Sequence, residues 1–380
     1  MEPMVRLSSR RHFLLSTAAL PWTAALFAQS PRRFERVHDP ENLESNFARL
    51  DGFLTPTDAF FVRNHFAIPA MDVANYRLQV EGAVRKPLSL SLAELQALAG
   101  EPTTRPLTLE CAGNGRVYLS PPVRGVAWQS GAVGTASWTG CPVDQVLRAA
   151  EVASNAVEVV FEGADSGTVA DPASPGPISF ARSLPLAKAR RPEVMLAWGM
   201  NGQPLTPRHG APLRVVVGGW YGMASIKWLK RILVVTEPFQ GFYQTLDYSY
   251  FRRVGGVPTL TPITVMQVKS QIARPAPHDV IPAGRPYTIL GAAWAGENAI
   301  SRVELSIDNG KTWSDAQLSE TQAPFCWRLW QFVWDSPRRG TVRLMARATD
   351  DHGNTQPMQR DPDRRTYMIS HVVPVEVEVR

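Results

Sequence analysis

One cysteine, Cys111, lies in a setting that could give it chemistry. It follows the apolar run Leu107–Leu109, lies among small residues up to Gly115, and precedes Arg116 by five positions. Glycines let a backbone approach a bulky ligand closely. A nearby arginine favours the thiolate, which is the form that binds metals and attacks electrophiles. The sequence therefore offers Cys111 as a metal ligand or a nucleophile, and the commoner alternative is a buried thiol that acts as a small apolar side chain.

The other two cysteines do not extend such a site. Cys141 lies between glycine and proline, and Cys326 lies between two aromatic residues, so both are predicted to be buried thiols. Three is an odd number, so at least one cysteine lacks an intramolecular disulfide partner. The sequence has no Cys-x-x-Cys pair, which argues against an attached c-type haem, a structural zinc and an iron–sulfur cluster.

The first 28 residues have the features of an export signal. Arg10 and Arg11 are followed by a short apolar stretch through Leu26 and by small residues near Ala28. Adjacent arginines are typical of the twin-arginine pathway, which carries folded proteins. A basic surface helix is the alternative, but the apolar block is not periodic. We expect a periplasmic protein that holds a cofactor, with no membrane span in the mature chain, because no later segment reaches 18 apolar residues.

Length and charge narrow the classes of function. The chain of 380 residues is long enough for two or three domains. Its formal charge of +6 is spread among acidic residues, and no basic block interleaved with aromatics predicts nucleic-acid binding. Neither a Walker sequence nor a Gly-x-Gly-x-x-Gly turn supports a nucleotide cofactor. A locally positive pocket for a small anion stays open.

The elements that must hold the cysteine are predicted by residue periodicity. Residues 76–81 alternate as a half-buried strand does, and Ser91–Leu95 contains a capping box that opens a helix. A second helix is predicted over 142–150, with proline in its first turn, and the apolar residues 213–217 predict a central strand. These patterns indicate a mixed α+β domain over residues 29–258.

From about residue 262 the pattern changes to alternating strands separated by turns. They are predicted at residues 263–268, 287–290, 301–307, 327–334, 340–347 and 375–379. This spacing is typical of an antiparallel sandwich of immunoglobulin type, here over residues 262–380, with the boundary near Pro258 to Pro262. Residues 306–313 also fit the Asp-box hairpin of sialidase propellers. The pattern occurs once, so we interpret it as a hairpin turn in the sandwich.

Five segments, in order along the chain, resemble the sulfite oxidase family of molybdenum enzymes. They are Phe60–His65, Glu110–Arg116, Met200–Pro204, His209–Arg214 and Gly219–Leu229. The resemblance begins near Phe60 and covers most of the mature chain, including the carboxy-terminal sandwich, which is the dimerisation domain in that family. It implies a molybdopterin cofactor with molybdenum and a homodimer, whereas the absence of haem from this chain is predicted from the missing Cys-x-x-Cys-His motif.

The resemblance also implies roles for single residues toward the cofactor. Cys111 would supply the protein thiolate on molybdenum, and the pterin dithiolene would supply the other sulfurs; a soft thiolate suits such a metal. The residues that fall where the family holds the pterin and its phosphate are Asn64, His65, Asp165, His209, Arg214, Ser225, Ile226 and Lys227. A hydrogen-bonded scaffold role is the alternative for the two histidines.

Substrate handling is assigned by the same resemblance to a second group of residues. They are Arg63, Arg116, Trp128 and Tyr248, with Arg365 as a further candidate. Guanidinium groups bind and orient a small dianion such as sulfite. On a strand, Arg63 and His65 would share one face. Trp128 would form a wall of the pocket, and core packing is its alternative.

The implied reaction is the oxidation of sulfite to sulfate by oxygen-atom transfer, with electrons passed to an external c-type cytochrome. Two departures concern the substrate: Gly115 stands where vertebrate and plant members have a second arginine, and Thr366 replaces an expected glycine beside Arg365. The alternative enzyme is the sulfane dehydrogenase subunit of a thiosulfate-oxidising complex, which acts on protein-bound sulfur. A methionine sulfoxide reductase, whose branch lacks the sandwich, and a metal-free exported binding protein are two further alternatives.

Overall fold

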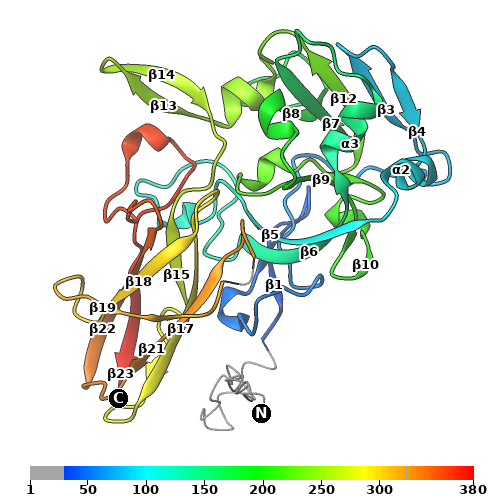
Figure 1. The fold of residues 1–380 in the computed structure, drawn as a ribbon. Helices are drawn as coiled ribbons and strands as arrows, with labels where there is room; N and C mark the ends of the chain where they lie inside the picture. The colour runs from blue at the N-terminus through cyan, green and yellow to red at the C-terminus, as the bar shows by residue number, and fades with distance from the viewer. Residues whose placement is uncertain (1–29, 322) are drawn as a thin grey trace, which may run out of the picture. The chain divides into compact units, whose positions relative to one another are not determined.

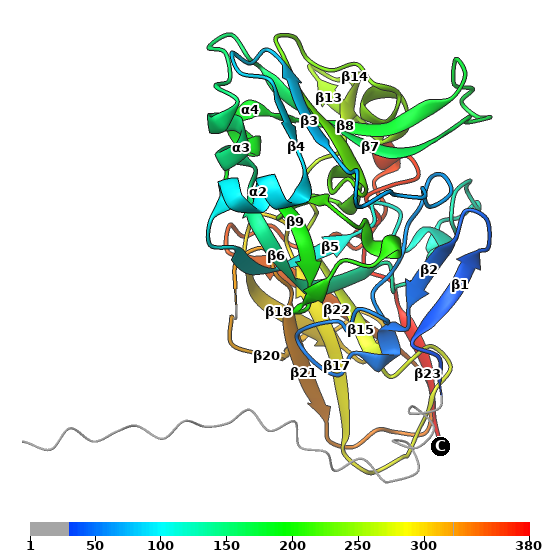
Figure 2. The same cartoon turned by 90° about the vertical axis from the view of Figure 1, so that its right-hand side faces the viewer.

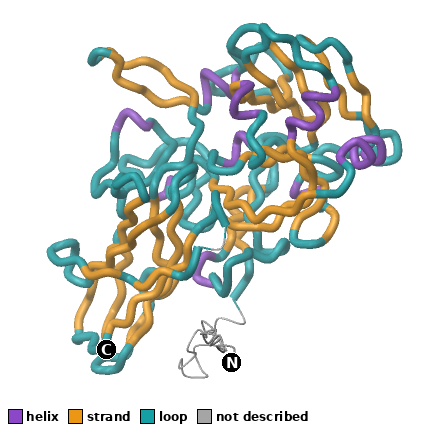
Figure 3. Tube along the Cα trace, in the orientation of Figure 1, coloured by secondary structure: helices purple, strands orange, loops and turns teal. Residues whose placement is uncertain are grey.

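The computed structural model of the protein describes residues 30–321 and 323–380 (Figure 1). The expected twin-arginine signal over residues 1–28 lies outside the described residues. Residues 32–380 form one compact unit in which strands dominate (Figure 3). No helix in the described part of the chain is long and apolar enough to cross a membrane.

The cysteine turn belongs to a five-stranded antiparallel sheet. Its strands, in spatial order, are β10 (Gln203–Pro204), β9 (Val194–Met200), β6 (Val133–Pro142) and β5 (Thr103–Glu110), and β11 (Arg214–Val217) also pairs with β9. β11 is buried along its whole length, but its ladder partner is β9 alone. The predicted strand over 213–217 is present, but it is not a central strand of its sheet. Its apolar residues are buried by packing against other layers and not between two neighbouring strands.

A second sheet of five strands forms a separate layer of the same domain (Figure 2). Its order is β4 (Leu88–Leu90), β3 (Leu78–Gly82), β12 (Leu229–Val235), β7 (Glu158–Gly167) and β8 (Ile178–Pro185). β12 runs parallel to β3 and antiparallel to β7. A small hairpin of β1 (Arg33–Val37) and β2 (Asn42–Ser45) precedes both sheets. The strand predicted at 76–81 corresponds to β3.

Helices are few and short in the described residues. α2 (Leu92–Ala99) begins as predicted, because the Ser91 hydroxyl accepts from the Glu94 backbone amide and the Glu94 carboxylate accepts from the Ser91 amide. α3 (Val143–Ala149) has Pro142 as its N-cap, and α4 (Leu186–Ala189) is a single turn. Short turns of tighter or wider helix are η1 (Phe47–Arg49), η2 (Arg116–Tyr118), η3 (Pro207–His209), η4 (Gly222–Ala224), the π-type η5 (Phe242–Asp247) and η6 (Pro362–Arg364).

The carboxy-terminal part consists of two sheets. One contains β15 (Lys269–Arg274), β17 (Tyr287–Trp294), β21 (Arg328–Trp334) and β20 (Gln317–Leu318) in spatial order. The other contains β16 (Val280–Ile281), β23 (Val375–Val379), β22 (Gly340–Asp350), β18 (Ile300–Ser306) and β19 (Ser314–Asp315). One apolar core joins both sheets, with Ile289 and Trp330 from the first and Val303, Leu344 and Val377 from the second. The immunoglobulin type of this arrangement stays a prediction.

One expectation at the start of this part differs from the structure. Residues 263–268 do not form the predicted strand; burial falls on Ile263, Met266 and Lys269, a spacing of three that reflects packing against the first domain. The residues of the expected boundary, 258–262, lie in β14 (Val257–Pro262), and the boundary itself stays a prediction. With β13 (Ser249–Val254), β14 forms a hairpin that projects from the rest of the chain (Figure 1).

The Asp308 region is a hairpin turn, as predicted. It joins β18 to β19, and the Asp308 carboxylate accepts hydrogen bonds from the backbone amides of Lys311 and Thr312 and from the Thr312 hydroxyl. These hydrogen bonds to the charged form hold the pKa of Asp308 below its usual value.

Candidate cofactor and substrate site

A cavity opens where the two sheets of the first domain and the helical turns between them meet. Nine of the residues selected from the sequence line it together: Arg63, His65, Cys111, Asp165, His209, Arg214, Ser225, Lys227 and Tyr248. Segments that are up to 185 positions apart thus contribute to one site.

Cys111 follows directly on β5, and a tight turn fixes its position. Its backbone amide donates to the Ala132 carbonyl at 2.9 Å, and its own carbonyl accepts from the Asn114 amide at 2.8 Å. The residue is 7% exposed and lines the cavity, so its thiol is placed to bind a group inside. The other cysteines do not line this cavity. Burial raises the pKa of both the Cys141 and the Cys326 thiols to about 12, which leaves them protonated.

Three cations of the cavity wall have no carboxylate within ion-pair distance among the described residues. Arg214 donates to the carbonyls of His209 and Ser225. Lys227 donates to the Asn64 side chain and to a backbone carbonyl, and Arg63 likewise contacts backbone and amide oxygens. All their hydrogen-bond partners are neutral, and Asp165 is a single acidic side chain beside them, so the wall keeps a net positive charge that favours an anionic ligand.

The pKa values of neighbouring groups respond to burial and to this charge. Burial and the charge on Arg214 lower the pKa of the Lys227 ammonium well below its usual value. Burial, with Arg214 and Lys227, also lowers the pKa of His209 to about 3, so this imidazole is neutral near pH 7. Asp165 is the acidic counterpart in the wall, and burial raises its pKa to about 6 although Lys227 and Arg63 oppose the shift.

An aromatic group forms the side of the cavity near Tyr248. The phenol lies 2.7 Å from His65 Nε2, and the His65 ring stacks on Phe180 with centroids 4.1 Å apart. Burial and the charge on Arg63 lower the pKa of His65 well below its usual value, so the ring is neutral. Tyr248 in turn packs on Tyr367, with centroids 4.8 Å apart. Arg63 and His65 share the cavity, but their segment contains only a single bridge and is not the predicted strand.

Glycine at position 210 allows two of these groups to approach each other. Its φ is +100°, and a Cβ atom there would lie 2.9 Å from the Lys227 Cβ. Such a contact is too short for two carbon atoms, and the left-handed backbone disfavours other residues. Gly210 therefore brings the η3 turn, which ends at His209, against the Lys227 segment.

Two of the predicted cofactor residues lie behind the wall of the cavity. The Asn64 side chain is buried; it accepts from Lys227 and donates to the Glu41 carbonyl, so it orients the ammonium. Ile226 is in the apolar core, and its carbonyl accepts from the Val215 amide. Both support residues that line the site, but the structure does not place their side chains in it.

Three residues predicted to handle substrate lie outside the cavity wall. Arg116 is buried, and its guanidinium donates to the carbonyls of Val126 and Thr366. Trp128 is fully buried in the apolar cluster that contains Cys111, and its indole N–H has no partner in the described structure. Arg365 is at the surface and donates to the Ser249 hydroxyl at 2.6 Å. Contacts with residues far away in the sequence set the directions of these three side chains, and residue spacing does not predict such contacts.

The sequence reading missed one buried cation behind the cavity, Arg182. It is fully buried on β8, and its guanidinium donates to the carbonyls of Tyr243, Gln244, Tyr248 and Ile263. Burial lowers its pKa to about 10. The sequence signal that could have identified Arg182 is an arginine on the apolar face of an alternating strand. Other missed residues of the wall are Phe180, Arg208, Met223 and Trp228.

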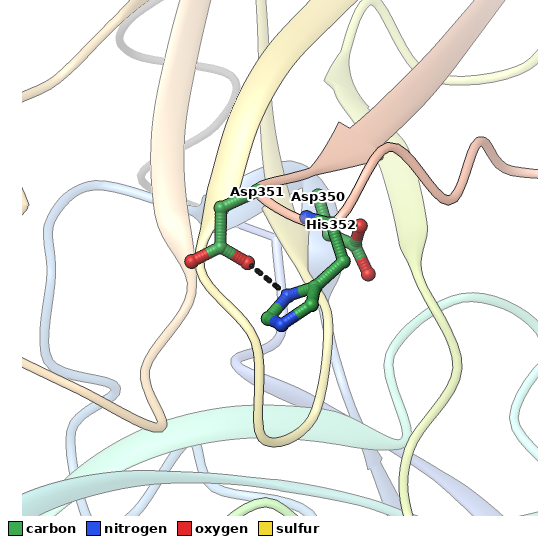
Figure 4. A group of neighbouring side chains, drawn as sticks. All are labelled: Asp350, Asp351 and His352. Carbon is green, nitrogen blue, oxygen red and sulfur yellow. Dashed lines mark hydrogen bonds and ion pairs between the residues drawn. The ribbon is translucent and has the colours of Figure 1, made fainter.

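A second group of possible metal ligands lies at the end of β22 (Figure 4). Its buried carboxylate, on Asp350, already accepts from the amides of His352 and Asn354 and from the side chains of Asn354 and Asn298. The His352 ring donates to Asp351 at 3.0 Å. These hydrogen bonds define a turn, and we assign no metal to it.

The residues of the main cavity fit a molybdopterin cofactor. A cavity-facing thiol offers the soft ligand that such a metal takes, and unpaired cations suit the phosphate and the dithiolene charge. Cys111 would ligate the metal, Arg214 and Lys227 would face anionic groups of the pterin, and the neutral His65 and His209 could donate or accept hydrogen bonds.

Comparison with known proteins gives the same indication. Residues 65–243 match the family described as "Oxidoreductase molybdopterin binding domain", and residues 261–371 match the "Mo-co oxidoreductase dimerisation domain". The mitochondrial sulfite oxidase of Mus musculus is 37% identical over 351 residues, which are 88% of this chain and 61% of that protein. The sulfite oxidase of Gallus gallus is 36% identical over 322 residues, or 80% and 68% of the two chains. This chain thus spans about three fifths of the mammalian relative.

A solved structure shows the same fold over nearly the whole chain. It is the sulfane dehydrogenase SoxCD from Paracoccus pantotrophus, with a TM-score of 0.79 and 26% identity. The match covers 98% of this chain and 93% of that one.

Replacing Arg182 tests whether its hydrogen bonds to the carbonyls behind Tyr248 stabilise the fold. Arg182→Met should lower the free energy of unfolding by about 3 kcal/mol or more, because buried carbonyls lose a charged donor. Arg182→Lys should recover part of the loss, and Arg343→Met, at an exposed ion pair, should change it by less than about 0.5 kcal/mol. Urea unfolding measures all three; equal stability of the Met variant and the wild type would refute the role.

The depressed pKa of His209 predicts a pH dependence of stability. The unfolded side chain takes up a proton below about pH 6.5, whereas the folded one stays neutral down to about pH 3. The free energy of unfolding should therefore be maximal above pH 7 and fall toward pH 4, by up to about 1.4 kcal/mol per pH unit from this group. His209→Gln should have a shallower slope in cofactor-free protein. Parallel slopes for variant and wild type would contradict the prediction.

Proposed function

Because this chain belongs to the sulfite oxidase family of molybdopterin oxidoreductases, we propose that it oxidises sulfite to sulfate and passes the electrons to an external c-type cytochrome. The chain is a molybdenum cofactor-dependent enzyme. The observation that supports the proposed substrate class is the cavity itself, in which one thiol and three unpaired cations meet. An oxyanion that approaches the metal would meet positive charge at the same place.

The cofactor, when bound, supplies oxygen-atom transfer and a two-electron change of oxidation state. The chain contributes binding, orientation and charge. Cys111 would hold the metal through its thiolate, and Arg214 and Lys227 would hold the anionic end of the pterin. The Ser225 hydroxyl accepts from the Val217 amide at 3.0 Å, which fixes the η4 segment at the edge of the cavity, where it would support the pterin.

Arg63 is the residue that we propose for binding sulfite. Its Nη1 contacts oxygens of Asn42 and Asn64, while its Nε and Nη2 have no partner among the described residues. These N–H groups form the fork that binds an oxyanion with two hydrogen bonds. Tyr248 could donate its phenol proton to the same anion, because burial keeps the pKa of this phenol above its usual value and the group stays protonated.

The remaining parts of the proposal concern partners and place. Residues 261–371 match a dimerisation domain, so we propose a homodimer with a twofold contact. The sequence of residues 1–28 supports export to the periplasm by the twin-arginine pathway. A periplasmic c-type cytochrome would then accept the electrons.

A second candidate is a sulfane dehydrogenase subunit that acts on sulfur bound to a partner protein. Two observations favour it: the fold match to such an enzyme over 93% of that chain, and Gly115 in place of a second arginine. Purified enzyme with sulfite and cytochrome c, and no carrier protein, separates the candidates. Rapid cytochrome reduction supports sulfite oxidation, whereas activity only with a carrier bearing a cysteine-bound sulfur supports the second candidate.

Replacing Arg63 tests its role in binding sulfite. Arg63→Met should raise the KM for sulfite by about tenfold or more, since a charged hydrogen bond to the dianion is lost. Arg343→Met, at an exposed pair in the sandwich, serves as the control and should leave the KM unchanged. The assignment fails if both variants keep the wild-type KM in cytochrome-linked assays.

Cofactor loading provides a separate check on Cys111. Cys111→Ser replaces the soft sulfur by a weak oxygen ligand, so purified protein should contain clearly less molybdenum per chain than the wild type. Elemental analysis measures this directly. Molybdenum-free wild-type protein from a host that makes the cofactor would contradict the enzyme proposal.

A further inference from the structure

The turn that carries Cys111 is clamped by side chains of the carboxy-terminal domain. Glu110, the residue before the cysteine, accepts hydrogen bonds from Lys269 Nζ at 2.9 Å and from the Trp294 indole at 2.9 Å. Lys269 begins β15 and Trp294 ends β17, and the two are paired in register. The clamp therefore comes from adjacent strands of one sheet.

Asn114 closes the clamp on the other side of the cysteine. Its side chain donates to the Glu110 carboxylate at 3.1 Å and accepts from the Ala132 amide at 3.1 Å. Its carbonyl accepts a second hydrogen bond from Lys269 Nζ, also at 3.1 Å. One lysine thus bridges the residues at both ends of the five-residue segment that contains Cys111.

The backbone of the turn also depends on the carboxy-terminal segment. The Ala112 carbonyl, directly after the cysteine, accepts from the Met368 amide at 2.7 Å. The Arg116 guanidinium donates to the Thr366 carbonyl, and a Cβ atom at Gly113 would collide with this guanidinium. These contacts restrict the motion of the turn relative to the carboxy-terminal segment.

The Glu110–Lys269 pair is enclosed by protein. The side chains are 2% and 4% exposed, respectively. Removal of one partner from such a pair leaves an uncompensated buried charge, which is strongly destabilising. The described residues offer Glu110 no other cation at ion-pair distance. The position of the turn should therefore respond directly to the loss of Lys269.

We propose that Lys269 and Trp294 are positioning residues for the Cys111 thiolate, so that the carboxy-terminal domain sets the geometry of a ligand in the other domain. They act through Glu110 and Asn114 and do not contact the reacting atoms. The inference rests on the proposed function only in treating Cys111 as the metal ligand. It gives the domain that matches a dimerisation module a second task within its own chain.

The test uses three full-length variants. Lys269→Met removes the cation at similar length, and Trp294→Phe removes only the indole donor. Arg347→Met is the matched control, because Arg347 also pairs with a poorly exposed carboxylate, Glu304, but within the sandwich and away from the cysteine turn. Thermal unfolding of each variant shows which ones fold.

The first measurement is the alkylation rate of Cys111 by iodoacetamide in cofactor-free full chain, followed by peptide mass. Lys269→Met should raise this rate by about tenfold and Trp294→Phe by about threefold, because the thiol leaves its fixed, buried position more often. Arg347→Met should match the wild type. This readout needs neither molybdenum nor sulfite, so its outcome is separate from that of the proposed function.

The second measurement is the Mo(V) electron paramagnetic resonance spectrum of the loaded full chain. A displaced thiolate should shift the g values in Lys269→Met, whereas a purely structural role would lower the melting temperature and leave the spectrum unchanged. Wild-type alkylation and spectra in both variants would overturn the proposal. Should Lys269→Met not fold, Trp294→Phe decides: a wild-type alkylation rate and spectrum in that variant would also overturn it.

Discussion

The site depends on three cations that have no carboxylate in ion-pair contact among the described residues, although Asp165 lies in the same cavity wall. Arg63, Arg214 and Lys227 surround one cavity, and burial of unpaired cations costs free energy. The fold meets that cost with dipoles: backbone carbonyls and amide side chains accept from each cation. An anionic cofactor would complete the charge balance. Burial, with the neighbouring cations as the second cause, lowers the pKa values of Lys227 and His209.

The sequence predicted those residues whose roles depend on local motifs. The five ordered segments contain seven of the nine predicted residues that line the cavity, all but Asp165 and Tyr248, and the capping box at Ser91 located a helix start. The directions of side chains that depend on distant contacts do not follow from the sequence: the Arg116 guanidinium donates to the Thr366 carbonyl, 250 positions away, and its role toward substrate stays a prediction. Arg182 was missed because its partners are carbonyls, which leave no trace in a residue pattern. Residues 263–268 alternate in the sequence as a strand does, but in the structure burial falls on every third residue, because the apolar side chains there pack between domains without a ladder.

Residues of both the first domain and the carboxy-terminal part of the chain build the site. Tyr248 belongs to the first domain, but it packs on Tyr367, whose phenol donates to Asp247 at 2.7 Å. Arg365, which the family resemblance assigns to substrate handling, donates to the hydroxyl of Ser249, the residue directly after Tyr248. The residue pattern predicts a domain boundary near residue 262. The segment around 365–368 nevertheless contacts both Tyr248 and the turn that carries Cys111. A domain border defined by strand pattern therefore does not separate the parts that build the site.

At position 115, where vertebrate and plant members have a second arginine, the backbone conformation itself favours glycine. Its φ is +95°, and a Cβ atom there would lie 3.1 Å from Ile369 Cγ2, so an arginine at this position would need both a strained backbone and a shifted neighbour. The pocket must then bind its substrate with the cations that remain. If the phosphate and dithiolene of the cofactor engage Lys227 and Arg214, Arg63 is the unpaired cation left for the substrate. One guanidinium fork can hold one oxyanion edge, which is compatible with sulfite and makes affinity for it depend on Arg63 more than in a pocket with two arginines.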